Sequence, residues 1–179
     1  GNIKLFISGA AALDSEIEAR YRLLGINIVQ GYGLTETSPV VAVGSNKEYK
    51  TGSIGNAIPG VEVKLANTDK DGMGELLVKG QNVALCYYND EQATKDAFEG
   101  EWFHTGDLAK IDDEGYIFIC GRKKSVIVLK NGKNIFPEEM ENLINQIEGI
   151  KESFVFGKQQ SRDKENIKIH VKVVYDKEE

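Results

Sequence analysis

The chain has 179 residues, of which 41% are hydrophobic, and it carries a formal net charge of −6. This hydrophobic content supports a packed core and argues against wholesale disorder. The acidic balance argues against nucleic acid as the main partner, because binding a phosphate backbone needs a basic surface. No apolar run reaches the length of a membrane span, and no basic-then-apolar signal pattern is present, so we expect a soluble, cytoplasmic protein.

The chain contains two cysteines, Cys86 and Cys120, which lie in different segments. Their positions do not follow the spacing of metal ligands. We therefore expect both to be buried core thiols, which suits a reducing compartment.

The first 30 residues are predicted to form a strand, a helix and a second strand. Ile3–Ile7 and Ile26–Val29 are short apolar runs that are typical of buried strands. Between them, Ser15–Glu18 has the spacing of a capping box at a helix start, and Gly25 suits the helix end. Two short strands joined by a helix are expected to be parallel, with a right-handed crossover.

From about Ser45 to Cys120, glycines punctuate short strand-like runs, which indicates twisted β structure. A short helix is expected near Glu91–Phe98. The predicted strands of this region are Val61–Leu65, Glu75–Lys79 and Tyr116–Cys120.

After Gly121 the pattern is that of a small α+β module. Ser125–Leu129 is a predicted strand, Asn131-Gly132 a turn, and Pro137 the first position of a helix. Two further strands are predicted at Phe154–Phe156 and Ile167–Tyr175. The fold class is therefore mixed α/β, or α+β, with one domain over residues 1–120 and a second over residues 121–179.

Two glycine-containing loops follow the two predicted opening strands. The first, Ser8–Ala11, contains Gly9, and the second is Gly31–Thr37 (GYGLTET). If the strands are parallel, both loops leave the same edge of the sheet, where open α/β sheets bind their ligands. Tight strand-to-helix connections produce the same pattern, so geometry alone leaves both interpretations open.

The residue types of the second loop favour a ligand site. Gly31 and Gly33 allow the backbone to approach a ligand closely. Tyr32 offers an aromatic face, Thr35 offers a hydroxyl, and Glu36 offers a hard oxygen ligand suited to Mg²⁺. A lone loop carboxylate is usually only solvated, so Glu36 carries little weight by itself.

Three motifs occur in order: GYGLTET, HTGDL (His104–Leu108) and GRKK (Gly121–Lys124). Their order and spacing resemble the adenylate-forming (AMP-binding) superfamily of acyl-CoA synthetases, peptide-synthetase adenylation domains and luciferases. Within it, the chain most resembles a long-chain fatty-acid–CoA ligase. The resemblance covers essentially the whole chain. It implies a carboxyl-side fragment: the end of the large adenylating domain, with its β-α-β unit and twisted β subdomain, followed by a partial small α+β cap.

The resemblance also implies an activity. Such an enzyme uses ATP as substrate and Mg²⁺ to convert a fatty acid to acyl-AMP, and then coenzyme A to form acyl-CoA, releasing pyrophosphate and AMP. Peripheral membrane contact of the longer enzyme would be compatible with a lipid substrate. The residues leave the oligomeric state open.

The resemblance assigns roles to residues of the first domain. Tyr32 would stack on adenine, with Gly9, Gly31 and Gly33 close to the nucleotide. Thr35 and Glu36 would be the catalytic residues, Thr35 at the α-phosphate and Glu36 as the Mg²⁺ ligand. Asp107 of the Thr-Gly-Asp motif would accept hydrogen bonds from both ribose hydroxyls. Without the other motifs, Asp107 would be interpreted as a turn aspartate beside a glycine.

In the second domain, Arg122 would reach the ribose or phosphate, which suits a permanently charged fork of donors. Lys124 would sit at the hinge about which the cap rotates between the two half-reactions. Gly132 would belong to the loop presented during thioester formation, although an ordinary hairpin glycine explains it equally well. Ser125 departs from the acidic residue that long-chain ligases often have there, which puts the details of the hinge in doubt.

Two features of the family are absent from these residues: the Ser/Thr/Gly-rich phosphate loop, expected before residue 1, and the cap lysine, expected after residue 179. We therefore expect this fragment to be inactive by itself. Alternatives are an aryl- or aminoacyl-adenylating enzyme, an acyl-carrier-protein ligase, or a non-catalytic nucleotide-binding module. The apolar run Ser38–Val43 suits a fatty acyl chain, or forms ordinary strand core.

Overall fold

The computed structural model describes residues 3–9, 13–160 and 163–175. Contacts divide the chain into two compact units, Gly1–Cys120 and Gly121–Glu179. Each unit is described by itself below.

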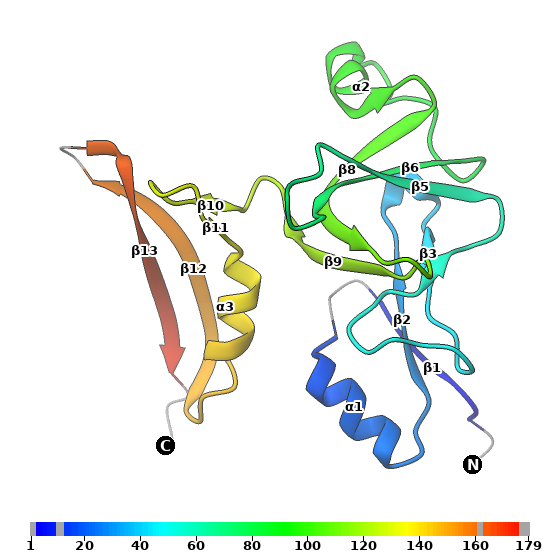
Figure 1. The fold of residues 1–179 in the computed structure, drawn as a ribbon, viewed down its shortest axis with the longest axis horizontal. Helices are drawn as coiled ribbons and strands as arrows, with labels where there is room; N and C mark the ends of the chain where they lie inside the picture. The colour runs from blue at the N-terminus through cyan, green and yellow to red at the C-terminus, as the bar shows by residue number, and fades with distance from the viewer. Residues whose placement is uncertain (1–2, 10–12, 161–162, 176–179) are drawn as a thin grey trace. The chain divides into compact units, whose positions relative to one another are not determined.

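The first unit opens with the predicted β-α-β arrangement (Figure 1): β1 (Phe6–Ser8), α1 (Ser15–Leu23) and β2 (Ile28–Tyr32). Strands β1 and β2 pair in parallel, as expected. Strands β3 (Ala42–Val43) and β4 (Asn56–Ala57) extend the sheet antiparallel, in the order β1-β2-β3-β4. The parallel pairing brings the carboxyl ends of β1 and β2 to one edge.

The cap of α1 differs from the expectation. Asp14, rather than Ser15, is the N-cap residue, and its Oδ1 accepts hydrogen bonds from the backbone N–H groups of Glu16 (2.8 Å) and Ile17 (3.0 Å). The predicted Ser15–Glu18 capping box was therefore wrong by one position, because an aspartate carboxylate is an equally good cap and lies nearer the first unpaired N–H groups.

A second sheet of the first unit follows. Its strands are β5 (Val61–Ala66), β6 (Gly74–Gly80), β8 (Trp102–Ile111) and β7 (Phe98–Glu99) in spatial order, and β9 (Ile117–Arg122) also pairs with β8. Helix α2 (Glu91–Ala97) precedes β7 at one end of this twisted sheet, as Figure 1 shows. The predicted positions of β5, β6, β9 and α2 are confirmed within one or two residues. The ten-residue strand β8, which carries HTGDL, was not predicted.

The core of the first unit joins both sheets. Its buried side chains are Val41, Ala42, Ile54, Leu76, Val78, Ala109 and Ile117. The cysteines lie outside this core: Cys86 is exposed and Cys120 is half-buried. The prediction of two core thiols was wrong for Cys86, because it belongs to the segment that connects β6 to α2 along the surface.

The second unit contains two hairpins and one helix. Strands β10 (Ile127–Val128) and β11 (Asn134–Ile135) form the first hairpin, and β12 (Ile150–Gln160) and β13 (Asp163–Tyr175) form the second. Helix α3 (Pro137–Ile144) begins with its proline in the first turn, as predicted. Glu141 of α3 accepts a hydrogen bond from the Val155 backbone N–H (2.7 Å), which fixes the helix against β12. This arrangement confirms the expected mixed fold class.

The three α-helices of the described residues have 9, 7 and 8 residues. Within that part of the chain, none is long and apolar enough to cross a bilayer.

Candidate functional site

Gly9 and Gly31, one from each glycine-containing loop, lie next to each other. Gly9 follows β1, and a Cβ atom built on Gly9 would lie 3.6 Å from the carbonyl oxygen of Gly31 in β2. The parallel pairing of β1 with β2 explains this proximity, since both chains leave the sheet at the same edge. Ala10 and Ala11 of the first loop lie outside the described residues.

The second loop turns sharply after β2. It contains a 3₁₀ turn, Thr35–Thr37, followed by Ser38 in the left-handed region with φ +53°. A Cβ atom on Gly33 would overlap the carbonyl oxygen of Pro39, whereas one on Gly31 would make only an ordinary contact with Ile7 at 3.6 Å. Glycine is therefore required at position 33 by the loop's own chain. The predicted close approach of a ligand is not needed to explain it.

Polar contacts inside the loop fix its shape. Thr37 is fully buried, and its Oγ1 accepts a hydrogen bond from the Leu34 N–H (2.9 Å) and lies 2.9 Å from the Pro39 carbonyl oxygen. The Asn82 side-chain amide donates to the carbonyl oxygens of Thr37 (2.9 Å) and Val40 (2.8 Å). Asn82 follows β6 of the second sheet. Its hydrogen bonds therefore connect the second sheet to the loop that follows β2 of the first sheet.

Replacing Asn82 with alanine is expected to lower the free energy of unfolding by about 2 kcal/mol, because two hydrogen bonds of about 1 kcal/mol each are lost. Urea unfolding of the chain measures this change. Gln81→Ala is the matched control, since Gln81 is the exposed neighbour and should change stability little. Equal effects of the two substitutions would contradict a clamping role for Asn82.

Tyr32 and Asp107, which the resemblance assigns to the nucleotide, are 75 positions apart in the sequence but are in direct contact. The Tyr32 hydroxyl donates a hydrogen bond of 2.5 Å to Oδ2 of Asp107. The Tyr32 ring packs against the core of the first unit, and Asp107 is only 3% exposed. The GYGLTET and HTGDL motifs therefore form one site.

Asp107 reaches this position from a bulge in β8. The pairing of β6 with β8 shifts register between Glu75, opposite Leu108, and Leu77, opposite His104. Gly106 lies at this shift of register and has φ +73°, a backbone conformation that favours glycine. The Thr-Gly-Asp motif is thus part of a long strand and not an isolated turn.

Glu36 is half-buried and is held at two points. Its backbone carbonyl accepts a hydrogen bond from the Ala84 N–H (2.7 Å), and its Oε1 accepts one from the Tyr87 hydroxyl (2.7 Å). Burial, together with the bond to Glu36, raises the pKa of Tyr87 to about 12, so Tyr87 remains a neutral donor at physiological pH. The Thr35 side chain next to Glu36 is exposed.

Neither Tyr87 nor Asn82 belongs to a motif that is recognisable in the sequence. Tyr87 and Tyr88 are adjacent, and no pattern in the sequence separates them. The structure does, because Tyr87 is half-buried against Glu36 whereas Tyr88 is 92% exposed.

The acidic residues suit Mg²⁺ only when phosphate oxygens of a bound ligand complete the coordination of the cation. Within residues 3–9, 13–160 and 163–175, no group of three or more His, Cys, Asp or Glu side chains is arranged to hold a metal. Mg²⁺ is typically held by one or two carboxylates, with substrate phosphates and water completing its shell. A single hard carboxylate at Glu36 fits that chemistry.

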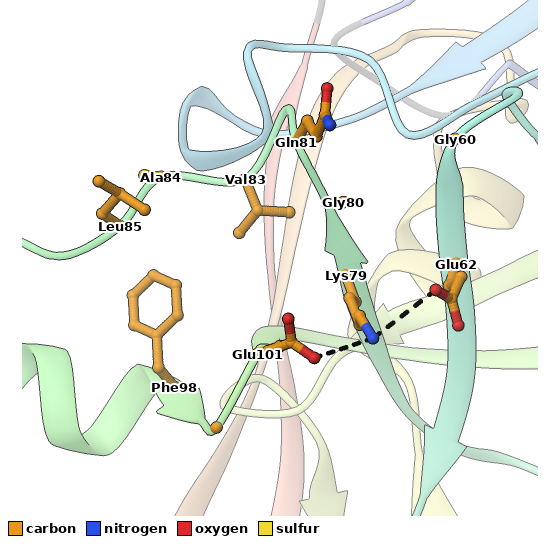
Figure 2. Close-up of a pocket in the computed structure, with 11 residues that line it drawn as sticks. Gly60, Glu62, Lys79, Gly80, Gln81, Val83, Ala84, Leu85, Phe98 and Glu101 are labelled. Atoms are coloured by element: carbon orange, nitrogen blue, oxygen red, sulfur yellow. Dashed lines mark ion pairs between the residues drawn. The ribbon is translucent and has the colours of Figure 1, made fainter.

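A cavity of about 450 Å³ lies beside this site in the first unit (Figure 2). Its lining includes Ala84, whose backbone N–H donates to the backbone carbonyl of Glu36. None of the lining residues is among those assigned to the nucleotide. Its one cation, Lys79, forms ion pairs with Glu101 (2.9 Å) and Glu62 (3.7 Å). Because these carboxylates outnumber the cation, the cavity is poorly suited to an anionic phosphate.

The remaining assigned residues belong to the second unit. Arg122 ends β9 and its side chain is exposed, as is that of Lys124. Gly132 lies in the turn between β10 and β11 with φ +78°, and a Cβ atom there would meet open space. The hairpin turn requires a glycine-like conformation, and a thioester-step role for Gly132 stays a prediction.

Comparison with known proteins agrees with the geometry. Residues 1–88 match the AMP-binding enzyme family, and residues 124–163 match the AMP-binding enzyme C-terminal domain. The long-chain-fatty-acid–CoA ligase FadD15 of Mycobacterium bovis is 40% identical over 157 residues, which are 88% of this chain and 25% of that protein. A long-chain-fatty-acid–CoA ligase of Escherichia coli is 35% identical over 177 residues, 95% of this chain and 31% of that one. The chain thus spans about a quarter to a third of these relatives.

Solved structures show the same relationship. The o-succinylbenzoate CoA synthetase of Bacillus subtilis, in complex with the acyl-adenylate intermediate OSB-AMP, has a TM-score of 0.90 at 28% identity, covering 98% of this chain and 37% of its own. The same enzyme in complex with ATP and magnesium ion has a TM-score of 0.86 at 28% identity, covering 96% and 36%. The chain belongs to the adenylate-forming, AMP-binding superfamily. Within that superfamily it resembles the acyl-CoA synthetases, as its three motifs indicated.

Proposed function

We propose that the chain is part of an ATP-dependent ligase that converts a fatty acid to acyl-AMP and then to acyl-CoA, with release of pyrophosphate and AMP. The observation that carries this proposal is the hydrogen bond between Tyr32 and Asp107, which joins two motifs into one site. The two fatty-acid–CoA ligases among its relatives support the reaction type.

The adenosine side of the site uses residues of both sheets. Gly9 and Gly31 lie next to each other without side chains, and Tyr32, which follows Gly31 and is half-buried, would offer its ring face to adenine. Asp107 accepts hydrogen bonds from the ribose hydroxyls, and bonds to a charged acceptor are stronger than neutral ones. The Tyr32 hydroxyl orients the Asp107 carboxylate for this task.

The phosphate side uses the 3₁₀ turn. Thr35 has an exposed side chain whose hydroxyl would contact the α-phosphate, and the neighbouring Glu36 carboxylate would hold Mg²⁺. When bound, the cation neutralises charge on the phosphate oxygens. The carboxylate of the fatty acid displaces pyrophosphate at the α-phosphorus, so the residues that position these two groups determine the rate.

The second unit supplies the parts for the thioester step. Arg122 would reach the ribose or phosphate, Lys124 would lie at or near the hinge, and Gly132 would belong to the loop presented to the active site in the thioester half-reaction. All three positions are exposed.

A long-chain fatty acid is the favoured substrate, because the curated ligases described above act on long-chain fatty acids by name. The run Ser38–Val43 contributes little to this choice, since Val41 and Ala42 are fully buried in the core. Val40 is 39% exposed and the neighbouring Pro39 is also exposed, so these two residues of the run can still contact an acyl chain. The reducing cytoplasm is the proposed location.

An aryl acid is the second candidate. The o-succinylbenzoate CoA synthetase, with its TM-score of 0.90, specifically favours this alternative. Pyrophosphate exchange driven by palmitate but not by o-succinylbenzoate supports the fatty-acid ligase, and the reverse supports an aryl ligase. Exchange with neither acid, together with intact nucleotide binding, would favour a non-catalytic module. Acyl transfer to a carrier protein in place of coenzyme A would indicate a carrier-protein ligase.

Fatty-acid-dependent exchange between ATP and pyrophosphate tests the proposal. The full-length protein that carries this sequence is expected to catalyse it, and Glu36→Gln is expected to reduce it by at least about 100-fold, since even residues that merely orient a metal ligand contribute 10–100-fold. Glu48→Gln, at an exposed glutamate, is the control. Full activity of the Glu36→Gln protein would overturn the assignment of Glu36.

The same assay tests the expectation for the 179 residues alone. Because the chain spans only 25% and 31% of the two ligases, we propose that adenylation requires more protein than this chain, and we expect no exchange. Exchange by the 179-residue chain that is lost on Glu36→Gln would disprove this expectation.

A further inference from the structure

The hydroxyl of Tyr87 lies against the carboxylate proposed to hold the metal. The Tyr87 Oη and Glu36 Oε1 are 2.7 Å apart, although the residues are 51 positions apart in sequence. A neutral tyrosine is a donor that leaves the negative charge of the carboxylate in place, whereas a lysine or arginine at this position would offset it.

Tyr87 is itself rigidly held. Its backbone N–H donates to Oγ1 of Thr94 (3.0 Å), and that hydroxyl in turn donates to the backbone carbonyl of Asp90 (2.8 Å), the N-cap residue of α2. Its ring packs edge-to-face on Phe98, with ring centres 6.3 Å apart. Helix α2 and β7 thus fix the point in space at which the hydroxyl is presented.

Glu36 is anchored by the same segment of chain. The Ala84 N–H binds its backbone carbonyl, and Tyr87, three residues later, binds its side chain. Figure 2 shows Ala84 on this segment, in the wall of the neighbouring cavity. A carboxylate whose backbone and one oxygen are both fixed has few orientations left for its second oxygen. Such hydrogen bonds to metal-binding carboxylates commonly tune metal affinity.

We propose that Tyr87 is a positioning residue that orients the Glu36 carboxylate, whose other oxygen would then be available to the Mg²⁺ of the ATP complex. This inference rests on the proposed function, in which Glu36 is the metal ligand. It adds a residue outside the three motifs and gives the segment between β6 and α2 a role in the site.

Tyr87→Phe removes the hydroxyl and keeps the ring against Phe98. Mn²⁺ serves as the probe for Mg²⁺, and its binding to the full-length protein saturated with ATP is followed by electron paramagnetic resonance. The dissociation constant of Mn²⁺ is expected to rise about 10-fold, the lower end of the range for residues that orient metal ligands. ATP affinity measured in EDTA is expected to stay unchanged, because Tyr87 acts on the cation and not on the nucleotide.

Tyr88→Phe is the matched control, since it deletes the same group from the 92% exposed neighbour and should leave both constants unchanged. Equal Mn²⁺ affinity of wild-type and Tyr87→Phe proteins, with loss of Mn²⁺ binding in Glu36→Gln, would overturn this inference alone. Unchanged Mn²⁺ binding in Glu36→Gln would overturn the metal role of Glu36 itself. If Tyr87→Phe weakened metal-free ATP binding as much as Mn²⁺ binding, Tyr87 would only support the loop, and the inference would also fail.

Discussion

Replacing Gly33 with alanine is expected to lower the free energy of unfolding by about 3 kcal/mol, near the upper end for overpacking. The added methyl group would overlap the Pro39 carbonyl oxygen, which also contacts the buried Thr37 hydroxyl. The loop cannot relax without breaking that contact. Because Glu36 lies between Gly33 and Pro39, nucleotide-dependent activity of the full-length protein should fall together with stability.

Gly31→Ala provides the comparison for Gly33→Ala. The new methyl group would meet only Ile7 at an ordinary contact distance of 3.6 Å, so the change in stability should stay within about 1 kcal/mol. Urea unfolding of both proteins measures the difference. Equal stabilities would show that the loop does not hold the tight conformation described here.

Replacing Asp107 with alanine is expected to weaken ATP binding about 100-fold. Hydrogen bonds to a charged group contribute about 1.5–3 kcal/mol each, and a loss of about 3 kcal/mol corresponds to roughly two factors of ten. Isothermal titration of the full-length protein with ATP measures the change. The same substitution leaves the Tyr32 hydroxyl without the acceptor that it has at 2.5 Å.

Two further proteins separate the contributions at this site. Tyr32→Phe removes only the hydroxyl and should weaken ATP binding by about 10-fold or less, as one hydrogen bond to a charged group is lost. Asp113→Ala, at an exposed aspartate beyond the end of β8, should have no effect. Wild-type affinity of the Asp107→Ala protein would remove Asp107 from the site.

Local pattern predicted three strands of the second sheet, β5, β6 and β9, but not the short strand β7 or the long strand β8. Strands β5, β6 and β9 are short runs rich in β-branched and other apolar residues, with glycines in the turns between them, and such runs predict strands whatever they pair with. Strand β8 escaped prediction because Gly106 interrupts it and Asp107 is charged, and both residues are typical of turns. The partners on β6 hold the chain extended on both sides of the bulge, so pairing overrode local preference.

The residues of the candidate site also divide into those that the sequence predicted and those that it did not. Gly9, Gly31, Tyr32, Glu36 and Asp107 were selected by residue type and by family resemblance. Tyr87 and Asn82 were not, because their partners are 51 and 45 positions away and no local pattern records such a pair. Similarly, Cys86 resembled a core thiol in composition and proved to be exposed.

By itself, the sequence determined the mixed fold class, the parallel opening strands and the membership of the adenylate-forming superfamily, because these rest on motif order and on periodicity within short segments. Only the tertiary structure decided what each motif residue contacts. Gly33 is required by the turn of its own loop. Asp107 lies at a strand bulge and accepts a hydrogen bond from the Tyr32 hydroxyl. One of two adjacent tyrosines reaches Glu36. Each of these outcomes depends on packing between segments far apart in the chain, and such packing is fixed only when the sheets assemble.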